Sequence, residues 1–432
     1  MTSVVADPTA PLLRLESALE RMLAGVTPLP AEAIELEGAV GRVLAEPLAA
    51  LVTMPPWDNS AMDGFAVRSV DVADATSERP VRLSVVGEVP AGQPARHPVA
   101  AGTAVRIFTG AMLPEGADTV VPVEDTDAPW GVADLPTRVA VRKAVASGEH
   151  VRPAGSDVRA GQPVASAGQV VRPATLALLA SSGYGRVRVH RRPRVTVISS
   201  GDELVPPGIA LQAGQIHDSN GPMLAALAAA EGAATTRAAS VADDLPSITR
   251  TLTEAIGQAD LVLTSGGVSM GARDVVRLAL ESVGRLELWR VAVQPGKPLA
   301  FARATRGAGA QEVLLFGLPG NPVSSFVTFQ LFVRPVLRRL AGHQDPLARE
   351  RWRARLAQPI VKHDERRAFL RVTLAPDPDR PGAWLAALAG GQGSHVLSAL
   401  AAADALAVMP EEVRELPAGA EVEVWPLHGE GD

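Results

Sequence analysis

Four acidic side chains occur where predicted strands end or a predicted helix begins, a position that suits cation chemistry. Glu203 follows one predicted strand, Asp243 and Asp244 follow the next, and Asp274 opens a later helix. Magnesium takes oxygen ligands and bridges phosphates through one or two carboxylates. Each acid taken alone is more often a helix cap or a solvated turn residue. Their occurrence after different strands of one predicted sheet favours a magnesium site that includes Glu203, Asp243 and Asp274.

A glycine turn after the third predicted strand adds phosphate chemistry. Ser265 precedes Gly266 and Gly267, whose backbone N–H groups can converge on an anion. The helix that begins near Asp274 would add its positive end to the same place. An ordinary tight turn remains the alternative, because short glycine motifs recur by chance.

Two further motifs bring polar groups to the same edge. Asn321 follows Pro319 and Gly320, and Pro322 comes next, which is the pattern of an N-cap with proline at the first helical position. Lys297 lies between prolines on a stiff turn, where its charge can contact an anion. A solvated surface lysine is the alternative for Lys297, and an ordinary cap is the alternative for Asn321.

These motifs must be positioned by a sheet. Between residues 188 and 340 strand and helix patterns alternate, which is typical of a mainly parallel sheet with crossover helices. Ligands of such sheets collect outside the carboxyl ends of the strands. The predicted strands are 195–198, 236–241, 261–263, 286–293 and 313–316, and the predicted helices are 223–231, 245–256, 274–283 and 323–340.

The rest of the chain predicts three further structural features. Leu12, Leu15, Leu19 and Leu23 fall on one face of an amphipathic opening helix. Short valine-rich runs with glycine and proline turns predict a β-rich domain over residues 51–144, inserted into an N-terminal domain made of residues 1–50 and 145–187. The α/β domain covers residues 188–340. Alternating short runs over residues 341–432 predict a small β barrel or sandwich.

Composition excludes several classes of function. The 432 residues contain no cysteine, which rules out disulfides, thiolate zinc sites and cysteine nucleophiles. A net charge of −6 without a Lys/Arg block argues against a nucleic-acid surface. P-loop and H-E-x-x-H motifs are absent. With no signal-like start and no apolar run of membrane length, the sequence predicts a cytoplasmic protein that does not enter membranes.

Several motifs together resemble the MoeA family, the molybdopterin molybdenumtransferases that also include the E domain of gephyrin. The matching stretches are PPWDNSAMDGFAV (55–67), IFTGA (107–111), GDEL (201–204), TSGGVSMG (264–271) with Asp274, PGKP (295–298), GLPGNPVS (317–324), RRAFLR (366–371) and GSHVLS (393–398). They occur in order over nearly the whole chain. One departure is Gln294 ahead of Pro295, where many relatives carry a lysine, so one expected positive charge is missing.

The resemblance implies a multidomain α/β plus β fold. The subunit would be elongated, with an inserted β domain, a three-layer α/β molybdopterin-binding domain and a C-terminal β barrel. The implied reaction joins molybdate to adenylylated molybdopterin with the help of Mg²⁺ and releases AMP. The functional polar residues implied by motif are Asp63, Thr109, Asp157, Glu203, Asp243 and Asp274. The implied anion contacts are Lys297, Arg366, Arg371, Ser394 and Ser398.

The resemblance also implies partners and leaves two alternatives open. A homodimer is expected, with sites that combine the inserted β domain of one chain with the α/β domain of the other. Contacts with a molybdopterin adenylyltransferase and with molybdenum enzymes are further expectations. The alternative functions are the adenylyltransferase reaction itself, which resides on a domain resembling residues 188–340, and a gephyrin-like scaffold. The inserted β domain and the barrel favour the later insertion step.

Overall fold

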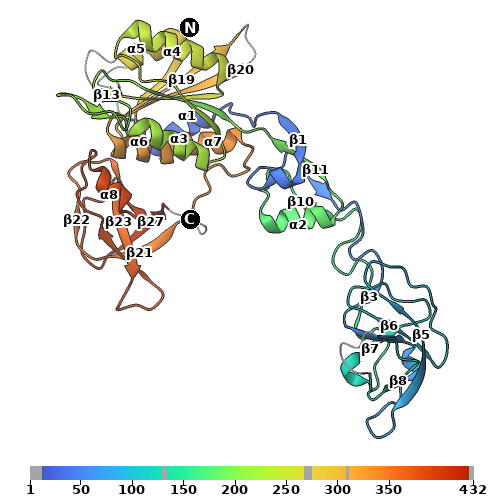
Figure 1. The fold of residues 1–432 in the computed structure, drawn as a ribbon. Helices are drawn as coiled ribbons and strands as arrows, with labels where there is room; N and C mark the ends of the chain where they lie inside the picture. The colour runs from blue at the N-terminus through green and yellow to red at the C-terminus, as the bar shows by residue number, and fades with distance from the viewer. Residues whose placement is uncertain (1–11, 129–133, 267–274, 308–310, 428–432) are drawn as a thin grey trace.

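The computed structural model describes residues 12–128, 134–266, 275–307 and 311–427, which form an elongated subunit (Figure 1). An α/β unit and a β barrel lie together at one end, and we call them the head. Two β-rich units extend from the head, and we call them the arm (Figure 1). The multidomain architecture predicted from the sequence is therefore confirmed.

The α/β unit is built on a six-stranded sheet with the strand order β15-β12-β16-β20-β19-β17. Its strands are β12 (Arg194–Ser199), β15 (Ala234–Arg237), β16 (Leu261–Ser265), β17 (Arg285–Arg290), β19 (Pro298–Arg306) and β20 (Gln311–Leu318), with a short pair β13 (Leu204–Val205) and β14 (Ile216–His217) beside them. The first four strands in the order are parallel. The sequence analysis missed β19, which makes β17 and β20 antiparallel to it.

Helices cover both faces of this sheet and give three layers. On one face lie α3 (Asn220–Ala230), α6 (Pro322–Thr328) and α7 (Arg334–Leu340), the last two joined by a π-helical turn, and on the other lie α4 (Leu245–Gln258) and α5 (Val275–Val283) (Figure 1). Strand side chains alternate between the two faces. Leu261 and Leu263 of β16 therefore join the core under α3, and Val262 joins the core under α4.

The opening helix α1 (Leu15–Leu23) packs on the head, although the sequence analysis placed residues 1–50 in the first domain. Leu15 and Met22 join the core that lies under α3 and α7. Arg303 of β19 donates from Nη2 to the carbonyl oxygens of Met22 at 3.1 Å and Ala24 at 2.7 Å. Carbonyls at a helix C-terminus lack partners within the helix. The missed strand β19 thus supplies the residue that holds α1 in place.

The C-terminal unit is a closed barrel, which decides between the two predicted alternatives. Five strands each pair with two others of the set: β21 (Trp352–Leu356), β23 (Arg367–Pro376), β24 (Trp384–Leu388), β25 (Ala405–Met409) and β27 (Glu421–Pro426). The short strands β22 (Ile360–Val361) and β26 (Glu415–Leu416) pair, and helix α8 (Leu397–Ala401) precedes β25. Strand β18 (Val293–Gln294) pairs with β23, which links the barrel to the α/β unit.

The arm contains an interrupted unit and an inserted β unit. In the first, β1 (Ala31–Glu35) pairs with β11 (Arg186–His190), β2 (Leu48–Ala49) pairs with β10 (Pro163–Ala165), and α2 (Pro173–Ser181) packs beside them. The inserted unit holds β4 (Gly64–Val67), β5 (Val81–Val89), β6 (Thr103–Ile107), β7 (Thr119–Pro122) and β8 (Arg138–Val141), and β3 (Asn59–Ser60) pairs with β9 (Val151–Arg152). No helix within the described ranges is long and apolar enough to cross a membrane.

Candidate active site

Acidic side chains gather at the carboxyl ends of β12 and β15. The backbone N–H of Asp243 donates to Asp202 Oδ1 at 3.1 Å. Partial burial raises the pKa of Asp243, and the nearby carboxylates of Asp202, Glu203 and Asp244 raise it further. A carboxylate opposed by neighbouring negative charge is stabilised by a cation. The structure thus brings the predicted Glu203 and Asp243 together in a place that favours a cation.

The carboxylates at this edge are compatible with the predicted magnesium site. Asp274 and Gly267, predicted for the same site, lie outside the described residues. Across the described ranges, no group of three or more acidic or histidine side chains is placed to hold a metal ion. Magnesium keeps several waters and bridges substrate phosphates through one or two carboxylates, rather than being enclosed by the protein. Glu203 and Asp243 fit that requirement.

The turns after β16 and β20 are tied together at the same edge. A Cβ atom on Gly266 would lie 2.1 Å from the Ser200 carbonyl oxygen, and its φ is +100°, so this close approach requires glycine. Asn220 donates from Nδ2 to Ser265 Oγ at 2.8 Å and to the Gly320 carbonyl oxygen at 2.7 Å. The sequence analysis missed Asn220, although a polar residue opening an otherwise apolar helix was a signal for it.

A cleft of about 530 Å³ lies between the α/β unit and the barrel. It collects predicted substrate-binding residues from both units: Lys297, Pro319, Gly320 and Asn321 from the α/β unit and Arg366, Arg371 and Ser394 from the barrel. Gly320 packs against Gly266, so the glycine turn borders the same region. The predicted phosphate turn and the predicted anion contacts therefore meet at one edge of the sheet.

Two hydrogen bonds close this cleft at one end. Asn321 donates from Nδ2 to Ser394 Oγ at 2.9 Å, and the Val323 N–H donates to the Ser394 carbonyl oxygen at 3.1 Å. Asn321 does occupy the predicted N-cap position of α6, but its side chain makes no capping hydrogen bond. The amide instead joins the α/β unit to the barrel loop that carries Ser394.

The cationic side chains of the cleft differ in the partners that they already have. Arg366 donates from Nε to Asp364 at 2.9 Å. The buried ammonium of Lys362, which the sequence analysis did not select, donates to the carbonyl oxygens of Arg366 at 2.8 Å and Glu411 at 2.9 Å. The half-buried Lys297 has no ion pair with any described residue. Lys297 is therefore available to neutralise an incoming anion.

Arg371 and Ser398 are placed differently from the other predicted anion contacts. Arg371 has no exposed surface, and its Nη2 donates to the carbonyl oxygens of Gly391 at 3.0 Å and Gly393 at 3.1 Å. Burial lowers the pKa of Arg371 to about 10, so it remains charged at neutral pH. Arg371 thus holds the loop that carries Ser394. Ser398 is exposed on α8 and is not among the residues that line the cleft.

The predicted residues of the arm form a separate group. Thr109 donates to Asp63 Oδ1 from its backbone N–H at 2.7 Å and from Oγ1 at 2.8 Å. Asp157 is exposed, and its N–H donates to the Met54 carbonyl oxygen at 3.2 Å. The unit that carries Asp63 lies at the far end of the arm (Figure 1). Within one chain, the structure does not bring Asp63 and Thr109 to Lys297.

This combination defines a class of protein in which an α/β domain with an anion-binding edge is joined to a β barrel and to a long arm with an inserted β unit. Three family models match this chain in order: the MoeA N-terminal region (domain I and II) over residues 13–183, the probable molybdopterin binding domain over residues 196–339, and the MoeA C-terminal region (domain IV) over residues 353–427. The chain belongs to the MoeA family, which makes it a transferase of molybdenum cofactor biosynthesis.

Named relatives and a solved structure agree with this assignment. Molybdopterin molybdenumtransferase 2 of Mycobacterium tuberculosis is 41% identical over 403 residues, covering 91% of this chain and 94% of the relative. Molybdopterin molybdenumtransferase of Haemophilus influenzae is 33% identical and covers 96% and 99%. The molybdopterin biosynthesis MoeA protein from Pyrococcus horikosii matches with a TM-score of 0.80 and 32% identity, covering 97% of this chain and all of that one.

Proposed function

We propose that this chain joins molybdenum from molybdate to adenylylated molybdopterin, giving Mo-molybdopterin and releasing AMP. The observation that carries the proposal is the cleft between the α/β unit and the barrel, where predicted anion contacts from both units meet. Gly320 lines this cleft and lies beside Gly266, which in turn approaches Ser200, three residues before Glu203. We therefore place the anion in the cleft and the cation at the acidic side chains near this turn.

The two ligands would occupy separate ends of this surface. Glu203 and Asp243 would hold a magnesium ion, which when bound supplies positive charge to the phosphoanhydride that is broken. The backbone at Ser265 and Gly266 would receive the phosphates. Molybdate is a tetrahedral dianion with no preference for carboxylates, so Lys297 and Ser394 would contact it in the cleft. Arg371 would act on molybdate through the loop that it holds.

The arm residues complete the proposed site only if two chains combine. Asp63 and Thr109 lie at the end of the arm, far from their own cleft (Figure 1). We propose a homodimer in which the arm of one chain reaches the cleft of the other. A two-fold dimer repeats such a contact and gives two equivalent shared sites. The role of Asp157, near the base of the inserted unit, also belongs to this proposal.

Subunit exchange tests both the proposed reaction and the shared site of the homodimer. Asp63→Ala chains and Asp243→Ala chains should each be nearly inactive in AMP release from adenylylated molybdopterin with molybdate and magnesium. After exchange, about half of the dimers are mixed and half of their sites are intact, so activity should return to roughly a quarter of wild type. Mass spectrometry would establish that chains have exchanged. If exchange is complete and activity stays absent, the two acids do not act in a shared site.

The substrate distinguishes this function from its alternative. A molybdopterin adenylyltransferase would consume ATP and molybdopterin, whereas the proposed activity requires adenylylated molybdopterin and molybdate. Assaying the purified protein with each pair separately decides between them, because only the second pair should yield Mo-molybdopterin. Contacts with the adenylyltransferase or with molybdenum enzymes, and a cytoplasmic location, stay predictions.

A further inference from the structure

Two chain segments connect the head to the arm, and we call them the neck. The first is residues 24–30, between α1 and β1, and the second is residues 191–193, between β11 and β12. Any change in the backbone of the neck changes the direction in which the arm leaves the head. The contacts of the neck, together with the hydrogen bond from Gln344 Nε2 to the Ala167 carbonyl oxygen at 2.6 Å, therefore contribute to where Asp63 and Thr109 lie.

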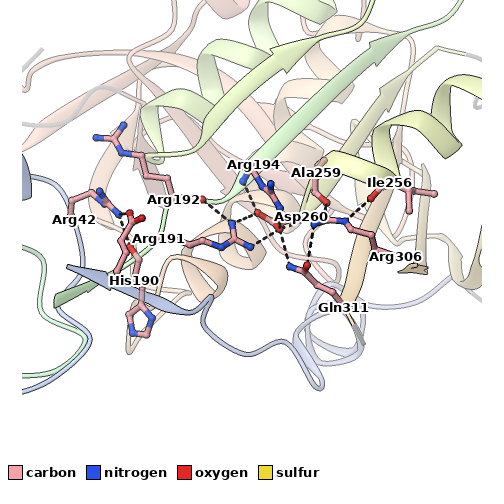
Figure 2. Close-up of polar contacts among 11 residues, drawn as sticks. Arg42, His190, Arg191, Arg192, Arg194, Ile256, Ala259, Asp260, Arg306 and Gln311 are labelled. Carbon is pink, nitrogen blue, oxygen red and sulfur yellow. Dashed lines mark hydrogen bonds and ion pairs between the residues drawn. The ribbon is translucent and has the colours of Figure 1, made fainter. Parts of the chain in front are cut away.

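Asp260 anchors the neck to the amino edge of the sheet (Figure 2). It is only 2% exposed and directly precedes β16. Arg191 donates to it through both terminal nitrogens, at 2.6 and 2.8 Å, and the Arg194 N–H donates to it at 2.9 Å. Burial alone would raise the pKa of Asp260, but hydrogen bonds and charge from Arg191 and Arg194 lower it overall. The bidentate pair fixes the orientation of Arg191.

Arg191 also connects the two segments of the neck. Its backbone N–H donates to the Pro30 carbonyl oxygen at 3.0 Å. The preceding residue, His190, donates from Nδ1 to the Leu29 carbonyl oxygen at 2.7 Å and accepts at its own carbonyl from Arg42 at 2.9 Å. Arg191 is therefore the point where the first segment, the second segment and the sheet are joined.

Close packing holds only part of the neck: Val26 and Leu29 are buried in the core under α3 and α7, and the Leu29 N–H donates to the Leu340 carbonyl oxygen at 2.8 Å. A solvent-open pocket of about 580 Å³ lies between residues 25–30 and a wall that includes Arg191, Arg194 and Gln311. Atoms that face a cavity lack the dispersion contacts of a packed interior. The direction of the neck therefore depends more on its polar contacts than it would in a fully packed joint.

We infer that Arg191, through its bidentate pair with Asp260, is a positioning residue that fixes the arm so that Asp63 and Thr109 reach the shared site. The inference rests on the proposed function, because it needs the arm to contribute to turnover. Arg191→Met should loosen the arm while Asp260 keeps Arg194 and Gln311 as partners. Arg192→Met is the matched control, since it removes the same charge from an exposed side chain of the same segment.

The distance between arm and head can be measured directly. The chain has no cysteine, so Ala177→Cys on α2 and Glu254→Cys on α4, both exposed, provide two unique labelling sites. Pulsed dipolar spectroscopy on labelled chains diluted with unlabelled protein gives the distance distribution within one chain. We expect Arg191→Met to broaden this distribution and lower kcat by roughly ten- to a hundredfold, with the KM for molybdate unchanged. Arg192→Met should change neither quantity.

Three outcomes bear on the inference. A broader distribution with lower kcat, and partial recovery of both in Arg191→Lys, supports it. An unchanged distribution in Arg191→Met overturns it, and so does a broader distribution with wild-type kcat. Failure of the proposed function gives a different result, because subunit exchange then restores no activity even though the wild-type distance distribution is narrow.

Discussion

A buried aspartate and an exposed one lie at opposite edges of the same mainly parallel sheet and have opposite surroundings. Asp260, at the amino edge, accepts hydrogen bonds from Arg191 and Arg194, and its pKa is lowered. Asp243, at the carboxyl edge, faces Asp202 and Glu203, and its pKa is raised. A carboxylate with matched partners contributes to architecture, whereas one left among like charges is ready for a ligand. Charge balance therefore distinguishes the structural amino edge of this sheet from the carboxyl edge that we propose to be functional.

The largest expected effect is the loss of stability in Asp260→Asn. The substitution leaves Arg191, Arg194 and Arg306 around a neutral group, and breaking a buried ion pair costs about 3–5 kcal/mol. Urea unfolding followed by circular dichroism should show a clearly lower midpoint. Asp243→Asn is the control at the other edge and should keep or slightly raise the wild-type midpoint, because it removes a carboxylate from among like charges. A midpoint for Asp260→Asn within error of wild type would contradict the structural role.

The next effect concerns turnover at the carboxyl edge. Asp243→Asn should lower AMP release by roughly 100-fold, because a ligand for the cation beside the phosphoanhydride is lost. Asp244→Ala is the comparison, because Asp244 is the next residue in the chain but has a structural role. It caps α4 by accepting the Ser247 N–H at 2.8 Å. Its loss should lower stability and leave the turnover of the folded protein near wild type. Equal turnover in Asp243→Asn and Asp244→Ala would contradict the assignment of Asp243 as a cation ligand and Asp244 as a helix cap.

The smallest expected effect is a difference in pH dependence between the two aspartates. The folded pKa of Asp243 is raised, so its contribution to stability falls as pH rises from the ordinary aspartate range through that pKa. The folded pKa of Asp260 is lowered, so its contribution is present above the ordinary range and is lost as pH falls through that pKa. Magnesium requires the ionised carboxylate, and its affinity should therefore increase as Asp243 ionises.

Calorimetric titration of magnesium between about pH 4 and 7 tests this last prediction, since the range spans the ionisation of a raised aspartate. Asp243→Asn should bind magnesium weakly and lose most of the pH dependence. Wild-type affinity that is constant over the range would show that Asp243 does not ionise on binding.

Local pattern was enough to predict the parallel core of the sheet and the residues that follow its strands. Runs such as Leu261–Ser265 are buried on both faces, and the turns after them must meet at one edge because the strands are parallel. Lys297 and Asn321 were selected from local pattern, and Arg366 and Ser394 from the family resemblance; the structure places all four in one cleft.

The features that were missed depend on contacts between distant segments. Strand β19 alternates large residues such as Phe301 with alanines, both buried, so it shows no polar alternation. The position of α1 depends on Arg303, nearly 280 residues further along the chain. The burial of Arg371 follows from carbonyls of a loop that returns to it. None of these pairings can be read from spacing.

The interrupted path of the arm has a consequence for synthesis on the ribosome. Strands β3 to β9 of the inserted unit are contiguous, so this unit has all its strands once residue 152 has emerged. The surrounding unit must wait for β10 and β11 to complete its core with β1 and β2. Helix α1 cannot be fully buried until α7 has also emerged, because its core partners include α7. Domains fold as units as they emerge. Helix α1 is therefore made well before the elements that bury its apolar face, and this face stays exposed while the arm is translated.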